Sequence, residues 1–149
     1  MSEEVIYSVV LGKNRKLHVT NKRVILAPEI NPKYQHLVGL VTVIYFTLIL
    51  RLGLSLFLAL LPAYFYFVFF LALRNFKEQK QLKVKGKSFS PSNSKITVVR
   101  SSYSRIEPVK FSIEDDAKKV KFELPPKEGE ELVKVFKNIG SFILEELYK

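Results

Sequence analysis

The apolar and polar positions of this chain are dominated by one block, Leu37–Leu73, in which Arg51 is the only charged residue. A helix that crosses a bilayer needs about 20 apolar residues, and about 17 are enough for a short crossing. The block is therefore too long for one crossing and fits two. We expect a helical hairpin with spans at Tyr34–Leu50 and Leu56–Leu73, joined by a turn at Arg51–Ser55.

Outside this block, apolar and polar residues alternate in short segments rich in β-branched and aromatic side chains. Alternation with a period of two is typical of half-buried strands, and Gly, Asn, Asp or Pro between such segments indicates turns. Asp115 to Ala117, for example, separates two clearly alternating segments. The pattern predicts seven strands, at residues 4–11, 16–20, 23–27, 82–85, 95–99, 109–113 and 120–124.

The pattern changes to a helical one after the seventh predicted strand. A helix is expected to begin near Lys127 or Glu128, with acidic residues at its positive end. Gly140 lies inside this pattern and is expected only to weaken the helix, by about 1 kcal/mol relative to Ala. Apolar residues recur at spacings of three and four and predict one apolar face, formed by Leu132, Val135, Phe136, Ile139, Ile143 and Leu147.

The net charge of +10 lies mainly beside the apolar block. Residues 74–105 hold nine Lys or Arg and one acidic residue, Glu78. An excess of Lys and Arg marks the cytoplasmic flanks of membrane spans. We therefore expect a multi-pass protein of the cell membrane, with two spans and both termini in the cytoplasm. The juxtamembrane basic residues that favour this orientation are Lys33, Arg74, Lys77 and Lys80.

The segment Leu17-His-Val-Thr-Asn-Lys-Arg-Val-Ile-Leu26 resembles the strand, Thr-Asn-Lys-Arg turn and strand of GRAM and prokaryotic pleckstrin-homology-like (PH-like) domains. Residues 96–124 resemble the second sheet of the same family. The resemblance implies an α+β, mainly β, fold: a seven-stranded PH-like barrel capped by a C-terminal helix. The transmembrane hairpin would be inserted between the third and fourth strands. The PH-like cytoplasmic domain would then comprise residues 1–33 and 75–149, and the hairpin residues 34–74.

Three basic residues, Lys13, Arg15 and Lys16, occupy the first predicted turn. In an antiparallel meander, this turn lies at the same end of the sheet as the inserted hairpin. In PH domains that bind phosphoinositides, the corresponding turn holds the head-group ligands. The resemblance therefore makes these residues candidates for binding lipid head groups. The alternative is that their charge only supports the membrane topology and selects no lipid.

A run of aromatic residues occupies the middle of the second predicted span. Such a run serves either as a packing face for a partner span or as bulk that faces lipid. Six aromatic residues in seven positions cover every side of a helix, so some of them must face something other than the first span. The candidates for a partner face are Tyr64, Phe65, Tyr66, Phe67, Phe69 and Phe70.

The sequence offers little support for catalysis. It contains no cysteine, and His18 and His36 are its only histidines. Glu114 to Asp116 is interpreted as a solvated turn rather than a metal site, and no phosphate-binding glycine loop is present. We therefore expect no catalytic residue, metal or cofactor, and a protein that is not an enzyme. The basic residues border a membrane span and no nucleic-acid-binding motif is present, which disfavours nucleic acid as a partner.

The function predicted from these observations is that of a non-catalytic, membrane-anchored PH-like scaffold, adaptor or accessory subunit of a membrane protein complex. Its partners would be membrane lipids and either another membrane protein or further copies of the chain. The alternative is a module that binds or senses anionic lipid at the cytoplasmic face of the membrane. A third hypothesis is a subunit of an enzyme or transporter whose active site lies in another chain.

Overall fold

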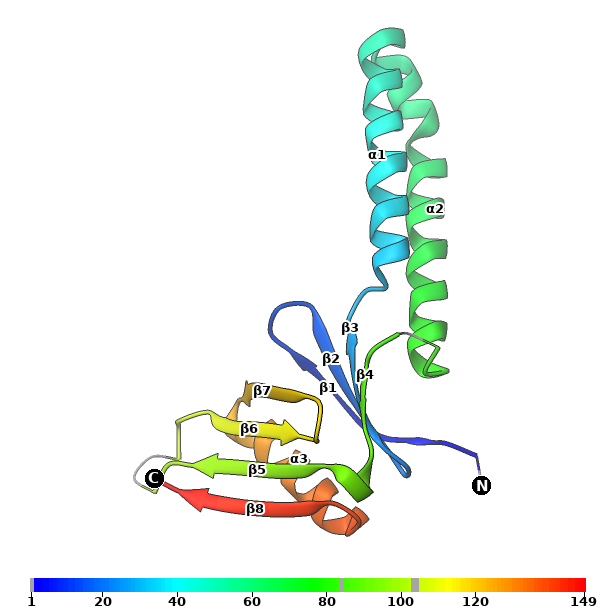
Figure 1. The fold of residues 1–149 in the computed structure, drawn as a ribbon. Helices are drawn as coiled ribbons and strands as arrows, with labels where there is room; N and C mark the ends of the chain where they lie inside the picture. The colour runs from blue at the N-terminus through cyan, green and yellow to red at the C-terminus, as the bar shows by residue number, and fades with distance from the viewer. Residues whose placement is uncertain (1, 84, 103–104) are drawn as a thin grey trace. The chain divides into compact units, whose positions relative to one another are not determined.

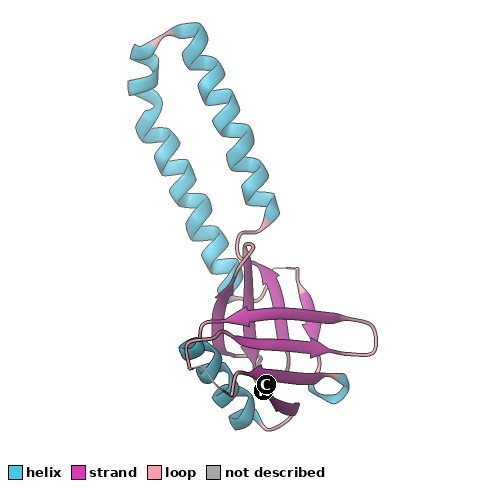
Figure 2. Ribbon diagram, turned by 90° about the vertical axis from the view of Figure 1, so that its left-hand side faces the viewer, coloured by secondary structure: helices cyan, strands magenta, loops and turns pink. Residues whose placement is uncertain are grey.

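A computed structural model describes residues 2–83, 85–102 and 105–149. The chain divides into two compact units, which are treated separately below. The strand unit comprises residues 1–27 and 86–149, and the hairpin unit comprises residues 28–85. Figures 1 and 2 show that the hairpin unit is built from two helices and that the strands belong to the other unit.

The hairpin unit consists of two antiparallel helices, α1 (Pro32–Leu52) and α2 (Leu54–Lys80). Helix α1 begins where Asn31 accepts a hydrogen bond from the Lys33 amide, with Pro32 in the first turn, where its missing N–H has no cost. The helices are joined through Gly53 alone, at a φ of +94° that favours glycine. The predicted hairpin is thus present, with longer helices and a shorter turn than expected.

The first sheet of the strand unit has the order β1-β2-β3-β4. Its strands are β1 (Val5–Leu11), β2 (Arg15–Thr20), β3 (Val24–Pro28) and β4 (Lys87–Phe89). Strand β4 pairs antiparallel with β3, with Val24 opposite Phe89. The hairpin unit is therefore inserted in the chain between two strands that pair with each other.

The second sheet has the order β7-β6-β5-β8. It contains β5 (Lys95–Arg100), β6 (Val109–Glu114), β7 (Lys119–Leu124) and β8 (Ile143–Tyr148). A short 3-10 helix, Pro91–Asn93, precedes β5, and helix α3 (Pro126–Ile139) lies between β7 and β8 in the chain. Strands β5, β6 and β7 form an antiparallel meander, whereas β8 runs parallel to β5.

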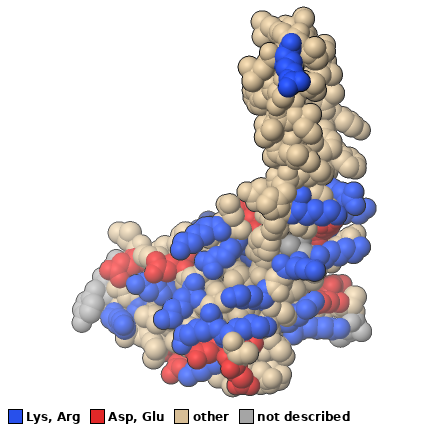
Figure 3. All heavy atoms as spheres, turned by 45° about the horizontal axis from the view of Figure 1, so that its top comes forward, with Lys and Arg blue, Asp and Glu red and all other residues tan. Residues whose placement is uncertain are grey.

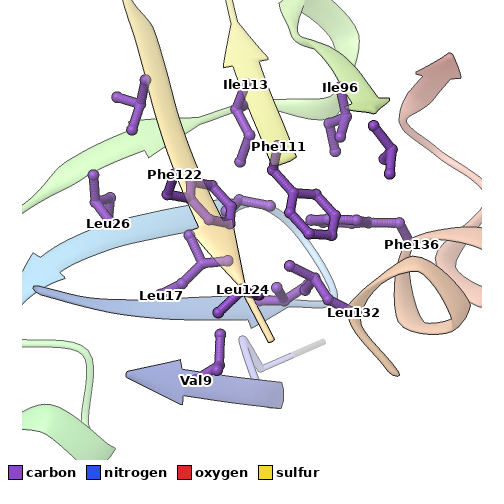
Figure 4. Packing of buried hydrophobic residues seen from close by; sticks show 14 of the residues in the cluster. Val9, Leu17, Leu26, Ile96, Phe111, Ile113, Phe122, Leu124, Leu132 and Phe136 are labelled. Atoms are coloured by element: carbon purple, nitrogen blue, oxygen red, sulfur yellow. The ribbon is translucent and has the colours of Figure 1, made fainter. Parts of the chain in front are cut away.

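One hydrophobic core takes side chains from both sheets and from α3. Burial alternates along β6 and β7, as their sequence pattern predicts. Phe111 and Phe122 face each other across these strands, with ring centroids 5.2 Å apart and nearly parallel planes. Leu132 and Phe136 enter the same core from α3 (Figure 4).

The predicted seven-stranded barrel with a C-terminal helical cap is wrong, although the broad α+β class is compatible with the structure. The described residues form eight strands in two four-stranded sheets, and these sheets do not close into a barrel. In a continuous meander, β5 would pair with β4. Here β8 occupies that edge of β5, from Lys95 opposite Ile143 to Arg100 opposite Tyr148.

The expectation that the last helix continues to Leu147 fails at Gly140. This residue has a φ of +66°, and its amide donates to the carbonyl oxygen of Phe136 over 3.2 Å. A left-handed residue with this hydrogen bond is a common helix C-terminus, and glycine adopts it without steric cost. Gly140 therefore ends α3, and the following residues extend as β8.

Ion pairs tie β8 to its neighbours. Glu146 pairs with Lys137 on α3 and with Arg100 on β5, the latter over 3.7 Å. The hydrogen bond from Lys137, aided by the charge of Arg100, holds the pKa of Glu146 below its ordinary value. The carboxylate thus remains charged at neutral pH and joins the helix to the two parallel strands.

The predicted strand at 82–85 is also wrong within the described residues. Leu82 has a φ of +55°, and its amide donates to Gln79, while the Lys83 amide donates to Glu78. These two bonds form a Schellman motif, which ends α2 by reversing the chain. The short fourth strand therefore begins later, at Lys87.

Replacing Gly140 with Ala should destabilise the strand unit by about 1–2 kcal/mol, because a Cβ atom is strained in the left-handed conformation. For a domain of this size, the melting temperature falls by roughly 4–8 °C for each kcal/mol. Thermal unfolding in detergent, followed by circular dichroism, measures the change. Gly12→Ala is the matched control, because an added Cβ at Gly12 meets no atom within 4 Å. Equal stability of Gly140→Ala and the unmodified chain would contradict the assignment of Gly140 as the helix terminus.

Candidate functional site

The two long helices are the strongest candidate for a functional site. Helix α1 has 21 residues and α2 has 27. At about 1.5 Å per residue they are about 30 and 40 Å long, and the hydrocarbon core of a bilayer is about 30 Å thick. Both helices are long and apolar enough to cross a membrane.

The apolar side chains of the hairpin are mostly uncovered. In each helix, only 6% of the most apolar 18-residue window is buried. A core helix of a water-soluble protein would bury this surface. Figure 3 shows the hairpin as a long surface of uncharged residues, with a single basic side chain near its tip. The largest exposed apolar residues include Leu40, Val43, Ile44, Phe46, Leu50, Leu58, Phe65, Tyr66, Phe69 and Leu73.

Polar side chains between the two helices are paired within the hairpin. The Tyr45 hydroxyl donates to the carbonyl oxygen of Phe57 over 2.9 Å, and the hydroxyls of Thr42 and Tyr64 lie 2.8 Å apart. The rings of Tyr45 and Tyr64 stack, with centroids 4.9 Å apart. Because hydrocarbon offers no hydrogen-bonding partners, such internal pairing is what a membrane-spanning hairpin requires.

A second polar cluster joins the helices at their open end, where α1 begins and α2 ends. The Glu78 carboxylate accepts hydrogen bonds from the Tyr34 hydroxyl and from the Asn31 side-chain amide, the latter over 3.2 Å. The Asn75 side chain accepts from the Asn31 backbone amide over 3.0 Å. We call this open end the base of the hairpin.

The chain entering α1 is also held by α2. The Gln79 side chain is 4% exposed and donates to the carbonyl oxygens of Pro28 and Glu29, over 2.7 and 3.1 Å. Asn75 donates to the same Glu29 oxygen over 3.3 Å. These bonds give the carbonyl oxygens of the half-buried residues Pro28 and Glu29 hydrogen-bonding partners.

The four juxtamembrane basic residues predicted from the sequence lie at this base. Lys33 is in the first turn of α1, and the other three are in the last two turns of α2. All four are exposed. We name this set the basic collar, and its members are Lys33, Arg74, Lys77 and Lys80.

The structure divides the aromatic run of α2 between two environments. Tyr64 and Phe67 are partly covered, and Tyr64 packs against Tyr45 of α1. The other four members are exposed, at Phe65, Tyr66, Phe69 and Phe70, with exposed fractions of 50–74%. These four form the part of the run available to lipid or to a partner.

The predicted head-group residues Lys13, Arg15 and Lys16 are not brought to one face. Lys13 lies in the turn between β1 and β2, with a φ of +66°. Arg15 and Lys16 are successive residues of β2 and therefore point to opposite faces of the sheet. Arg15 is on the side of the core residue Leu17, and its Nε is buried without a hydrogen bond.

The Thr-Asn-Lys-Arg turn that carries the family resemblance has a structural role. The Thr20 hydroxyl accepts hydrogen bonds from the amides of Lys22 and Arg23, over 3.1 and 2.9 Å. The Arg23 guanidinium binds both carboxylate oxygens of Glu3, over 2.7 and 3.1 Å. The hydrogen bond from Arg23 lowers the pKa of Glu3 below its ordinary value, so that the pair is charged at neutral pH.

Other sites of chemistry are not evident in the described part of the chain. No group of three or more His, Asp or Glu side chains among the described residues could hold a metal ion. His18 is buried in β2, and its Nδ1 lies 3.0 Å from the Ser8 hydroxyl.

Comparisons of the chain with protein-family models, with curated proteins and with solved structures find no match. The resemblance to PH-like domains therefore stays a prediction, carried by Leu17 to Leu26 and by the pattern of residues 96–124.

The polar contacts at the base of the hairpin are the feature that sequence reasoning missed. Asn31, directly before Pro32, was a detectable signal, because Asn before a Pro-initiated helix is a typical cap. The pairing of Asn31 and Tyr34 with Glu78 had no such signal, since it joins positions more than 40 residues apart.

Replacing Tyr34 with Phe should lower the thermal stability of the hairpin. The change keeps the ring but removes the donor to Glu78, so that a partly buried carboxylate loses a hydrogen bond. Tyr66→Phe is the matched control, because Tyr66 is 74% exposed. Helix melting by circular dichroism in detergent compares the variants. If both melt at the same temperature as the unmodified chain, the Tyr34–Glu78 contact does not hold the base together.

Proposed function

We propose that this chain is an integral membrane protein anchored by the α1–α2 hairpin, with both termini in the cytoplasm. The strand unit is a non-catalytic scaffold, adaptor or accessory subunit that the hairpin holds at the membrane. The observation that carries the proposal is the uncovered apolar surface of the two helices. The polar side chains of Thr42, Tyr45 and Tyr64 at the contact between these helices form hydrogen bonds within the hairpin. Exposing such an apolar surface to water is energetically unfavourable, whereas lipid or a partner span would cover it.

The charges at the two ends of the hairpin support the orientation. The basic collar lies at the base, whereas Arg51 is the only charged residue near the tip. Cytoplasmic flanks carry the excess of Lys and Arg. The base therefore belongs on the cytoplasmic side, together with the strand unit that is joined to it. Arg51, in the last turn of α1, extends its charged end to the outer interface.

The exposed aromatic residues of α2 support a partner within the membrane. Phe65, Tyr66 and Phe69 lie outside the contact between the two helices. Because lipid tails are as apolar as aliphatic side chains, membrane spans associate through close van der Waals packing rather than through the hydrophobic effect. Rigid rings that project from one helix suit that kind of packing and give the hairpin a surface for a second membrane protein or a second copy of the chain.

Single-cysteine labelling tests the topology, and the natural absence of cysteine makes the unmodified chain its own blank. The two positions chosen for cysteine are Ser55, which is exposed next to the hairpin turn, and Ser92, which is exposed in the 3-10 helix. A membrane-impermeant maleimide should label Ser55→Cys in intact cells and Ser92→Cys only after permeabilisation. Labelling of both variants in intact cells, or of neither before permeabilisation, would refute a hairpin that spans the membrane with cytoplasmic termini.

Purification of the tagged full chain from native membranes in mild detergent tests the proposed function. We expect a membrane protein, or a second copy of the chain, to co-purify in a fixed ratio. Replacing Phe65 and Phe69 with Leu should weaken the association about tenfold, equivalent to about 1.4 kcal/mol, and so lower that ratio, since the helix remains apolar but loses its rings. Phe46→Leu, which removes an exposed ring from α1, is the control. A strictly monomeric chain without any protein partner would contradict the accessory-subunit proposal.

A further inference from the structure

The basic collar is arranged around the base of the hairpin. In α2, Arg74, Lys77 and Lys80 follow one another at intervals of three residues, so each is turned by about 60° from the one before. The three side chains therefore spread over about a third of the helix surface. Lys33 adds a fourth charge from the first turn of α1, with its ammonium group 5.8 Å from the centre of the Tyr34 ring.

The acidic residue closest in sequence to the collar, Glu78, offsets only part of its charge. Glu78 lies between Lys77 and Gln79, but its carboxylate accepts hydrogen bonds from Tyr34 and Asn31. Within the described residues, its one ion pair is with Arg74, at 3.9 Å. Among the residues that the structure describes, Lys33, Lys77 and Lys80 form no ion pair with a carboxylate.

In a membrane-spanning hairpin, Arg74 and Lys77 lie at the depth of the lipid head groups, and Lys80 lies just beyond them, where its long, flexible side chain reaches back to the phosphates. The apolar stretch of α2 ends at Leu73, and Lys80 is seven residues further on, a rise of about 10 Å. The head-group region on each side of a bilayer has a thickness of about 5–8 Å. Phe76, which is 66% exposed, lies among the basic residues and supplies apolar contact at the same level.

We infer that the basic collar binds the head groups of anionic phospholipids in the cytoplasmic leaflet, through Lys33, Lys77 and Lys80, with Arg74 shared with Glu78. This inference rests on the proposed insertion of the hairpin in the membrane. It locates lipid binding at the base of the hairpin rather than at Lys13, Arg15 and Lys16, whose positions in the strand unit do not share a face. Because the Glu78 carboxylate is directed toward Asn31 and Tyr34, the basic collar keeps a net positive charge.

A tryptophan reporter beside the collar tests the inference in the full chain. The protein contains no Trp, so Phe76→Trp introduces a single fluorophore at an exposed position. The protein is reconstituted in phosphatidylcholine vesicles that contain either brominated phosphatidylcholine or brominated phosphatidylglycerol, which quench the fluorophore on contact. We expect a severalfold preference for phosphatidylglycerol, which decreases at high salt because surface charges are screened.

Charge variants then assign the preference. Lys33→Gln, Lys77→Gln and Lys80→Gln together should reduce it about fivefold or more, as expected from the contribution of each lysine near an anionic surface. The same three positions changed to Arg should keep it, which shows that charge and not folding is responsible. The matched control combines Lys13→Gln, Arg15→Gln and Lys16→Gln and should also keep it.

Three results would overturn the inference: equal quenching by both lipids, a preference that survives the collar substitutions, or a preference that is lost in the control at the β1–β2 turn. Equal quenching by both lipids would still place the hairpin in the bilayer. The absence of quenching by either lipid would instead refute the insertion on which the proposed function depends.

Discussion

The hydrogen bonds to Glu78 fix the two helices at their base. The carboxylate joins the last turn of α2 to Tyr34 in the first turn of α1 and to the cap residue Asn31. Covalently the helices are joined only through Gly53, so their alignment depends on this contact and, further along the hairpin, on the stacked rings of Tyr45 and Tyr64 and the hydrogen bonds of their hydroxyls. That alignment decides which side chains are uncovered. The outward position of the aromatic residues and of the basic collar both depend on it.

The hairpin could be predicted from the sequence because the thickness of a bilayer sets a minimum apolar length, which the block Leu37–Leu73 exceeds. Strands β6 and β7 could be predicted equally well, because one face of each strand lies in the core and their apolar and polar residues therefore alternate. The base of the hairpin could not be predicted in the same way. A Glu, an Asn and a Gln near the end of a helix resemble solvent-exposed residues, and only the return of α2 beside α1 gives them partners.

The C-terminal region was misinterpreted because its apolar residues satisfy two patterns. Ile143 and Leu147 continue the spacing of the α3 face, yet they also lie in a segment that pairs fully with β5. Gly140 decides between the two, since its left-handed conformation is the end of a helix rather than a weak point within one. At the end of α2, Leu82 has the same role without being glycine, and periodicity gave no warning of that turn. Both errors concern how helices end, and it is the end of α3 at Gly140 that lets the following residues join the second sheet as its parallel strand.

The residues that carry the resemblance to PH-like domains are engaged in folding. Thr20 bonds the amides of its own turn, and Arg23 holds Glu3 through two hydrogen bonds. Such a turn is favoured by local hydrogen bonding whatever ligand the rest of the domain binds. Likeness in this segment therefore concerns how β2 and β3 are connected, and a functional role cannot be inferred from it. Function has to be argued from surfaces that the fold leaves unsatisfied. In the described chain these surfaces include the apolar sides of the hairpin and the cations at its base, which in the proposed arrangement face the two zones of a membrane leaflet.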